Sequence, residues 1–208
     1  MPPGQPAKPR KSPSQSRARA TVDAILDAAA HILVNEGLAA ASTNRVAEKA
    51  GVSIGSLYQY FPNKAAMIGA LRRRHAEVMR NTVLQLAGPA ASEPIPQAVR
   101  SFIHAVMQAH RIEPQLHRIL AQEAPRTDFV DSRGDIDHDL RQVITALLTA
   151  RRNEILPTDP ALAAALLVKM SDALIHAAVI DHTLDADEQQ VEDEIVRVVL
   201  RYLLGNAA

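Results

Sequence analysis

Apolar residues recur three and four positions apart along most of the chain, which is the spacing of the buried face of a helix. No stretch shows the two-residue alternation that is typical of a strand. The pattern therefore predicts an all-α fold. The predicted helices comprise one that ends at Glu36, two short ones between Thr43 and Pro62, and longer ones over 64–86, 96–110, 114–123, 136–155, 161–181 and 187–204.

The two short helices between Thr43 and Pro62 are the most informative part of this pattern. We expect the hydroxyl of Thr43 to cap the first helix. Gly51 is expected to end it, because glycine adopts the left-handed conformation of a helix C-terminus without strain. Ser53 is placed to cap the second helix, which turns Leu57 inward. Two short helices joined by a tight glycine-containing turn predict a helix-turn-helix, whose second helix enters the DNA major groove.

The surface chemistry of the second short helix favours DNA binding over a plain corner between two helices. Ser56, Tyr58, Gln59 and Tyr60 are expected to point largely outward. Exposed aromatic and hydrogen-bonding side chains crowded on one helix favour a partner that covers them. Lys64 opens the next helix, where a positive side chain opposes the helix dipole unless a phosphate lies nearby.

The charge is unevenly distributed, although the whole chain has a net charge of +0. Residues 1–80 carry 12 Lys and Arg against 5 Asp and Glu, a net charge of +7. Residues 81–208 carry 11 against 18, a net charge of −7. The basic part suits a polyanion. Residues 1–16, which contain Lys8, Arg10 and Lys11, predict a disordered basic tail that is either a solvated leader or an arm along the phosphates.

Composition narrows the class of protein further. Hydrophobic residues make up 47% of the chain, enough for a buried core, and the absence of Cys excludes disulfides and thiolate metal sites. No run of 18 apolar residues and no signal-peptide segment is found, so we expect a cytoplasmic protein with no membrane partner.

Enzymatic and metal sites find little support in the sequence. The glycines form no phosphate loop, and neither H-E-x-x-H nor G-x-S-x-G occurs, so we expect no catalytic residues and no cofactor. Asp135, Asp137, His138 and Asp139 crowd a predicted helix start, where capping and the helix dipole explain them better than a metal ion. No metal site is therefore predicted.

The run of Ala47, Ala50-Gly51-Val52-Ser53, Gly55, Leu57-Tyr58, Tyr60-Phe61 and Lys64 resembles the signature of TetR-type transcriptional regulators. LacI-type repressors share the A-G-V-S corner but continue into a different recognition helix. The resemblance covers roughly residues 19–71; beyond them only helix pattern and chain length agree. It implies a three-helix DNA-binding domain over 17–63, followed by a helical effector-binding and dimerisation domain over 64–208.

The resemblance also implies roles for single residues of the helix-turn-helix. Thr43 and Lys64 are expected to contact phosphates, with Asn44 and Arg45 beside Thr43. Gly55 permits close backbone approach, and Gln59 is the candidate base reader because its amide can pair bidentately with adenine. The predicted DNA-binding set is Thr43, Asn44, Arg45, Ser53, Gly55, Ser56, Tyr58, Gln59, Tyr60 and Lys64.

The last two predicted helices are more apolar than a single packed face needs. They either form ordinary intramolecular core or meet their copies in a second subunit as a four-helix bundle. A helix-turn-helix usually needs two half-sites, and the resemblance implies the same, so we expect a homodimer. The predicted interface comprises Leu166, Met170, Leu174, Val191, Ile195, Val198, Tyr202 and Leu203.

The middle helices carry residues that would surround a pocket in a TetR-type architecture. Each histidine there is, by itself, an ordinary core residue, but as a group they could line a site for a mostly apolar molecule. The predicted effector site comprises Phe102, His104, Met107, His117, Met170 and His176.

Together these features predict a ligand-responsive repressor that binds a palindromic operator as a homodimer. Two alternatives stay open. One is a DNA-binding dimer without an effector, and the other is a helical small-molecule-binding protein with a vestigial helix-turn-helix. The sequence identifies neither the operator nor the effector.

Overall fold

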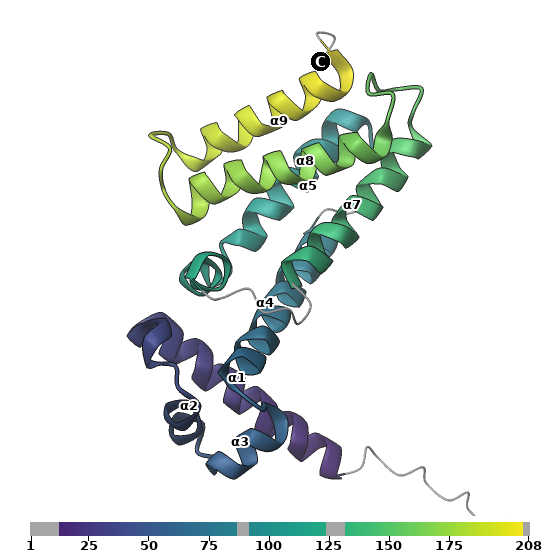
Figure 1. The fold of residues 1–208 in the computed structure, drawn as a ribbon. Coiled ribbons are helices and arrows are strands. Elements are labelled where there is room, and N and C mark those ends of the chain that lie inside the picture. Colours follow the sequence, from purple (N-terminus) through teal and green to yellow (C-terminus); the bar gives the residue numbers. More distant parts are fainter. Residues whose placement is uncertain (1–12, 87–91, 124–131, 206–208) are drawn as a thin grey trace, which may run out of the picture. The chain divides into compact units, whose positions relative to one another are not determined.

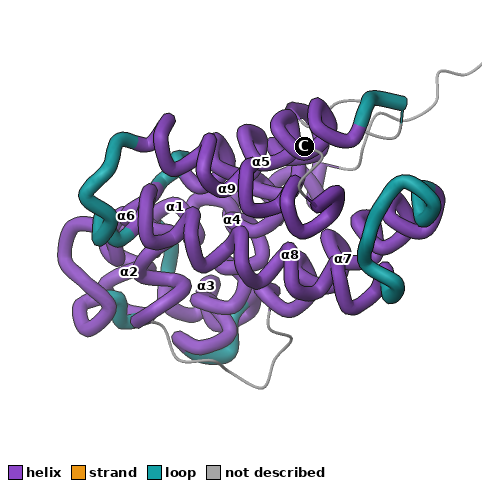
Figure 2. The backbone as a smooth tube through the Cα atoms, turned by 90° about the horizontal axis from the view of Figure 1, so that it is seen from above, coloured by secondary structure: helices purple, strands orange, loops and turns teal. Residues whose placement is uncertain are grey.

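The computed structural model describes residues 13–86, 92–123 and 132–205, which form helices joined by short loops and contain no strand (Figures 1 and 2). The predicted all-α fold is confirmed. The helices are α1 (Pro13–Ala40), α2 (Thr43–Ala50), α3 (Ile54–Tyr60), α4 (Lys64–Leu86), α5 (Ile95–His110), α6 (Pro114–Arg118), α7 (Ser132–Ala150), α8 (Pro160–Ile175) and α9 (Glu188–Leu204), with π-helical turns η1 (Ile119–Glu123) and η2 (His176–Ile180) after α6 and α8.

Several boundaries differ from those that the sequence predicts. The predicted helices over 114–123 and 161–181 each change from α- to π-helical winding part-way, as α6 with η1 and α8 with η2. The helix predicted to reach Ile155 ends at Ala150. Most of the predicted tail, including Lys8, Arg10 and Lys11, lies outside the described residues, and α1 already begins at Pro13. Asp135 and Asp137 lie in α7, but their side chains are outside the described part.

Of the two predictions for the first helix and its junction with α2, one is confirmed and one needs a correction. The regular winding of the first helix ends at Glu36 as predicted, because Gly37 has a non-helical backbone with φ 83°, and a separate short helical turn then continues α1 to Ala40. The cap of α2 is Ser42 rather than Thr43, since the Ser42 hydroxyl accepts from the backbone N–H of Arg45 at 3.3 Å. Both residues carry a hydroxyl, so the motif leaves the helix start uncertain by one position.

The chain divides into two compact units, residues 1–71 and 72–208, and α4 begins in the first unit and ends in the second. In the first unit, α1 packs against α2 and α2 against α3. The core side chains, all under 9% exposed, are Ile25, Leu26, Ala28, Ala29, Ile32, Leu33, Ala41, Val46, Ala47, Leu57, Phe61, Met67, Ile68 and Leu71. Burial of this apolar face, at about 25 cal/mol per Å², is what holds the short α2 and α3 in place.

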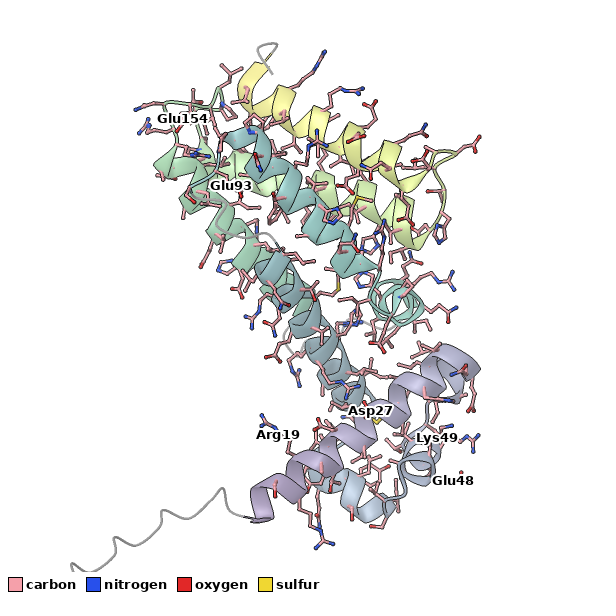
Figure 3. All side chains as sticks on the ribbon, turned by 180° about the vertical axis from the view of Figure 1, so that it is seen from behind. Arg19, Asp27, Glu48, Lys49, Glu93 and Glu154 are labelled. Atoms are coloured by element: carbon pink, nitrogen blue, oxygen red, sulfur yellow. The ribbon has the colours of Figure 1, made fainter. Side chains whose placement is uncertain are left out.

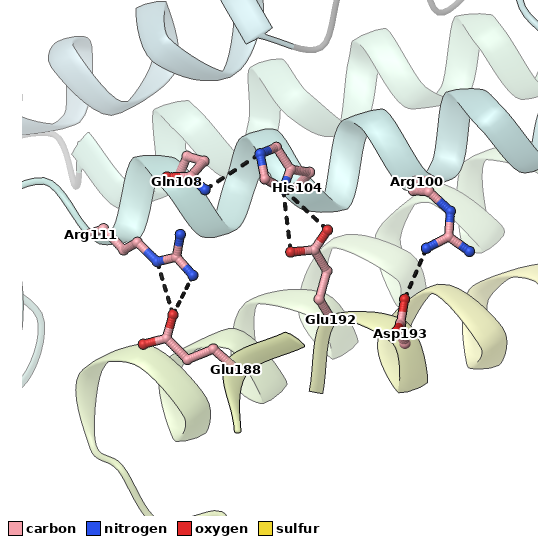
Figure 4. Close-up of polar contacts among 7 residues, drawn as sticks. All are labelled: Arg100, His104, Gln108, Arg111, Glu188, Glu192 and Asp193. Atoms are coloured by element: carbon pink, nitrogen blue, oxygen red, sulfur yellow. Dashed lines mark hydrogen bonds and ion pairs between the residues drawn. The ribbon is translucent and has the colours of Figure 1, made fainter. Parts of the chain in front are cut away.

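In the second unit, α8 packs against α7, and α5 lies against both α8 and α9. Ile103, Met107, Ile175, Ile195 and Leu203 are among its most buried side chains. Several polar side chains of α5 pair with side chains of α9 (Figure 4). The pairs are Arg100 with Asp193 at 2.9 Å, His104 with Glu192 at 3.2 Å, and Arg111 with Glu188 at 2.9 Å. Because the numbers rise along α5 and fall along α9, the two helices are antiparallel.

One segment, Pro160–Ile180, is long and apolar enough to cross a membrane by length and composition, with a mean hydropathy of 1.7. In this fold 56% of the segment is buried inside the protein. Many of its apolar residues, including Ala163, Ala164, Leu167 and Ile175, lie in the core of the second unit.

Candidate nucleic-acid interface and effector cavity

Local backbone chemistry fixes the turn between α2 and α3. Gly51 ends α2 with φ 67°, and the backbone N–H of Val52 donates to the carbonyl of Ala47 at 3.0 Å. Ser53 then caps α3 by accepting from the backbone N–H of Ser56 at 3.0 Å. Leu57 is fully buried and anchors α3 to the core. These contacts confirm the predicted turn, cap and inward residue.

The outer face of α3 presents aromatic and amide side chains to solvent. Tyr58 is 49% exposed and Tyr60 36%, and Gln59 is also exposed. The phenol oxygen of Tyr58 lies 3.2 Å from the hydroxyl of Thr43 on α2. This contact links the outer faces of the two short helices, so the start of α2 and the middle of α3 form one polar surface.

The smaller members of the predicted DNA-binding set lie around this surface. Asn44 is exposed at the start of α2, and Gly55 is exposed in the first turn of α3. The hydroxyl of Ser53, which caps α3, lies 2.8 Å from the hydroxyl of Ser56. A Cβ added to Gly55 would meet nothing closer than 3.9 Å, so the fold itself does not require a glycine there.

The two predicted cations of this region have partners within the chain. Lys64 is half-buried, and its ammonium donates to the carbonyl of Leu38 near the end of α1. Arg45 pairs with Glu36 and Glu48, each at 3.3 Å, and the hydrogen bond to Glu36 raises the pKa of Arg45. Glu48 and its neighbour Lys49 extend outward from α2 (Figure 3). Contact of Arg45 with a phosphate would therefore compete with its two carboxylate partners.

The residues predicted for a dimer interface fall into three groups, which are exposed, half-buried and buried in the core. Leu166 on α8 is 49% exposed, and on α9 Val198 is 42% and Tyr202 37% exposed. Met170 and Leu174 are half-buried. The other three, Val191, Ile195 and Leu203, lie in the core of the same chain. Leu162, 57% exposed and one turn before Leu166, adds to the exposed apolar strip.

A cavity of about 110 Å³ lies within the second unit, between α4, α5 and α8. Its walls are mostly apolar, with Met79, Val83, Phe102, Val106 and Leu140 among them. One part is polar, where His75, His110, His117, Ser171 and Asp172 meet. A partly apolar cavity with a few convergent polar groups is the usual form of a small-molecule site.

The structure places only some of the predicted effector residues at this cavity. Phe102 and His117 line it. His104 instead lies on the exposed side of α5, facing Glu192. Met107 is fully buried and Met170 half-buried, both at the hydrophobic core, while His176 packs against His117 beside the cavity.

Two family models match the chain. The model described as "Bacterial regulatory proteins, tetR family" matches residues 25–71, which contain the helix-turn-helix. The model described as "Tetracyclin repressor-like, C-terminal domain" matches residues 94–203, more than half of the chain. The chain belongs to the TetR family. It is thus a DNA-binding transcriptional regulator, as the residues around the turn predict.

Similar proteins extend this finding. The uncharacterized HTH-type transcriptional regulator YvkB of Bacillus subtilis is 39% identical over 67 residues, which are 32% of this chain and 35% of YvkB. The chain thus matches about a third of that relative's length. The crystal structure of NalD of Pseudomonas aeruginosa, the secondary repressor of the MexAB-OprM multidrug efflux pump, has a TM-score of 0.72 and 21% identity, with 92% of this chain and 99% of NalD covered. The SmeT–triclosan complex has a TM-score of 0.66 and 18% identity, with 90% and 93% covered.

Two histidines that the sequence does not single out, His75 and His110, join His117 and His176 in this TetR-family chain. In each contacting pair of these rings, the two ring centroids lie 4.8–5.2 Å apart. Burial lowers the pKa of His75, and the nearby Glu113 offsets this effect only in part. Since these residues come from α4, α5, α6 and η2, no local spacing in the sequence brings them together.

Proposed function

We propose that this TetR-family chain is a homodimeric repressor that binds a palindromic operator through α3 and releases it when a small molecule binds. The observation that carries the proposal is the outer face of α3. A seven-residue helix, anchored by the buried Leu57, exposes Tyr58, Gln59 and Tyr60 next to a glycine turn. A rigid short helix with outward polar and aromatic groups is the form in which a helix-turn-helix reads a major groove.

The roles within this surface follow from where each group lies. Thr43, Asn44 and Arg45 at the start of α2 are proposed to contact phosphates, and Lys64 at the start of α4 is proposed to add a cation. Ser56, Tyr58, Gln59 and Tyr60 face the groove, with Gln59 as the base reader. Exposed Gly55 lets the α3 backbone approach the DNA, while Ser53 holds the first turn of the helix.

The dimer is proposed to form through the exposed apolar strip of α8 and α9. Leu162, Leu166, Val198 and Tyr202 are each more than a third exposed although large and apolar. Covering them with the same strip of a second copy forms a four-helix bundle. Two recognition helices in one particle then meet two half-sites on one face of the DNA.

The effector is proposed to enter the cavity of the second unit. Arg72, His75, Ala76, Met79 and Val83 of α4 line that cavity, and the same helix begins at Lys64, directly after α3. A ligand that displaces α4 can thus change the spacing of the recognition helices. The mostly apolar wall suits an apolar molecule with one polar group, and SmeT, a neighbour of the same fold, is known in complex with triclosan.

The test of this proposal is a pair of titrations of the full chain with triclosan, with and without a duplex that the protein binds. Linkage requires that operator DNA weaken triclosan binding by the factor by which triclosan weakens DNA binding. We expect a coupling of about 2–3 kcal/mol, equivalent to roughly 30- to 150-fold. Tight but equal binding in both titrations would show that the cavity does not control DNA binding. Phe102→Trp, which fills the cavity, is expected to remove triclosan binding while DNA binding persists.

A further inference from the structure

Four imidazoles gather at the polar end of the cavity in the second unit. His75 comes from α4, His110 from the end of α5, His117 from α6 and His176 from the start of η2. The side chains of His75, His110 and His176 are 5%, 5% and 11% exposed. The potential ligand atoms of His110, His117 and His176 all lie within 4.8 Å of one another. Buried histidines in such a group need hydrogen-bond partners or a metal ion.

The tautomer of His110 is fixed by its neighbour on α5. Its Nδ1 lies 2.8 Å from the carbonyl of Val106, and because a carbonyl only accepts, Nδ1 carries the proton. The Nε2 atom of a neutral imidazole then holds a free lone pair. This Nε2 is buried and has no hydrogen-bond partner among the described residues. A histidine held by an Nδ1–H donation to a carbonyl, with Nε2 aimed into a polar cluster, is the arrangement of a metal ligand.

In His117 and His176, the Nε2 atoms face each other. The Nε2 atoms of His117 and His176 are 3.0 Å apart. Zinc binds imidazole nitrogen at about 2.0–2.1 Å, so two ligands of a tetrahedral ion lie about 3.3 Å apart. The carboxylate Oδ1 of Asp172 lies 3.5 Å from Nε2 of His176 and 3.8 Å from Nε2 of His110. Three imidazole nitrogens therefore lie together, and the Asp172 carboxylate lies beside two of them.

A second layer of contacts supports these ligands. The Nδ1 atom of His117 lies 3.1 Å from Nε2 of His75, and Nδ1 of His75 lies 3.7 Å from a carboxylate oxygen of Glu113. With His117 bound to a metal through Nε2, its Nδ1–H donates to His75, and the Nδ1–H of His75 points at Glu113. A hydrogen bond behind a ligating histidine fixes its tautomer and orientation, and His75 supplies that partner to His117, although Nδ1 of His75 itself makes no hydrogen bond to Glu113.

We propose that His110, His117 and His176, with Asp172 as fourth ligand, bind a divalent transition-metal ion with the ligand preference of Zn²⁺. Three imidazoles and one carboxylate suit Zn²⁺ and its spectroscopic substitute Co²⁺, whereas Mg²⁺ and Ca²⁺ take oxygen ligands. The ion ties together the end of α5, α6 and the start of η2, beside the effector cavity. The ligand atoms, which lie within 4.8 Å of one another, would have to adjust to the separation of about 3.3 Å that a tetrahedral ion requires.

The experiment uses the full chain, freed of metal with a chelator and titrated with Zn²⁺ by calorimetry and with Co²⁺ by absorption spectroscopy. We expect one ion per chain and the intense visible bands of tetrahedral Co²⁺, which Zn²⁺ then displaces. The measurement needs no DNA, so its result is independent of the proposed regulatory function. Absence of the tetrahedral bands in the unmodified protein overturns the proposal without recourse to any variant.

Matched variants separate this site from binding at surface histidines. His117→Ala and His110→Gln each remove one ligand and are expected to abolish tetrahedral Co²⁺ binding. His75→Gln removes only the supporting contact and is expected to weaken Zn²⁺ binding by roughly 10- to 100-fold. The control is His104→Gln, an exposed histidine of the same unit that faces Glu192, and it is expected to bind Zn²⁺ unchanged. Circular dichroism confirms that each variant is folded, and unchanged binding in folded His117→Ala and His110→Gln contradicts the assignment.

Discussion

The hydroxyl of Thr43, at the start of α2, lies 3.2 Å from the phenol oxygen of Tyr58, in the middle of α3. The two residues are 15 positions apart, and this hydrogen bond joins the outer faces of the two short helices. It fixes where the Tyr58 hydroxyl points before DNA arrives, and pre-organised side chains lose less entropy on binding.

Loss of this contact should weaken DNA binding without unfolding the protein. Tyr58→Phe keeps the ring and removes the hydroxyl, and Thr43→Val removes the other partner. Each is expected to weaken binding by about 0.5–1.5 kcal/mol, the usual size of one hydrogen bond. Fluorescence anisotropy with a bound duplex measures the effect. The double variant should lose less than the sum of the two single losses. Strict additivity would show that the two hydroxyls act independently on the DNA.

The glycines of the helix-turn-helix should respond oppositely to alanine. Gly51 has φ 67°, so Gly51→Ala is expected to lower the free energy of unfolding by about 1–2 kcal/mol. Gly55 has room for a Cβ, and Gly55→Ala should leave the free energy of unfolding unchanged or raise it by up to about 1 kcal/mol. The same Gly55→Ala change should reduce operator affinity, because the added methyl separates α3 from the DNA. If Gly55→Ala binds the operator with full affinity, the α3 backbone does not approach the DNA closely at Gly55. Urea denaturation and anisotropy provide the two readouts.

The exposed apolar strip on α8 and α9 predicts where a charge breaks the dimer. Val198→Asp should give monomers that keep their helical content, because the carboxylate would be buried in the proposed seam. Val143→Asp is the matched control, since Val143 on α7 is 46% exposed against 42% for Val198. Light scattering should show dimers for the control and monomers for Val198→Asp. If both variants stay dimeric, the dimer interface lies on another face of the protein. Leu203→Asp should instead unfold the second unit, as Leu203 is 2% exposed.

Lys64 serves both the fold and, in this account, the DNA. Lys64→Ala removes its hydrogen bond to the Leu38 carbonyl and is expected to lower the free energy of unfolding by about 0.5–1.5 kcal/mol. It should also reduce the slope of log affinity against log salt by about 0.9 per subunit, as one phosphate contact is lost. An unchanged slope would assign Lys64 to the fold alone. Asp23→Asn, at an exposed residue of α1, changes the net charge by one in the opposite direction and is a control for the effect of net charge alone.

The helix-turn-helix was predictable because its signals act within a few residues. Gly51 must adopt a left-handed conformation, and Ser53 caps a helix that starts at the next residue. The shift of the α2 cap from Thr43 to Ser42 shows the limit, since two adjacent hydroxyls compete for one role. Gly37 correctly signals the end of the first regular helix, but a glycine does not show that a further helical turn, here up to Ala40, follows it.

The second unit was less predictable because its site depends on packing between distant helices. His104 and His110 both lie on α5, yet one faces Glu192 on α9 and the other is buried among histidines. Helical periodicity places them on different faces but does not say which face meets the cavity. Likewise, Ile195 and Val198 lie one turn apart on α9, and only the fold shows that the first is core and the second exposed.

The measurement that tests the central claim most directly is selection of bound sequences from random duplex DNA, with wild type and Gln59→Ala in parallel. The account predicts that wild type enriches a palindrome whose half-site centres are separated by about 10–10.5 base pairs or a multiple. Gln59→Ala should enrich the same palindrome with relaxed preference at one base pair in each half-site, equivalent to about 1–3 kcal/mol. Failure of wild type to enrich any sequence, or identical profiles for the two proteins, would contradict operator reading by α3.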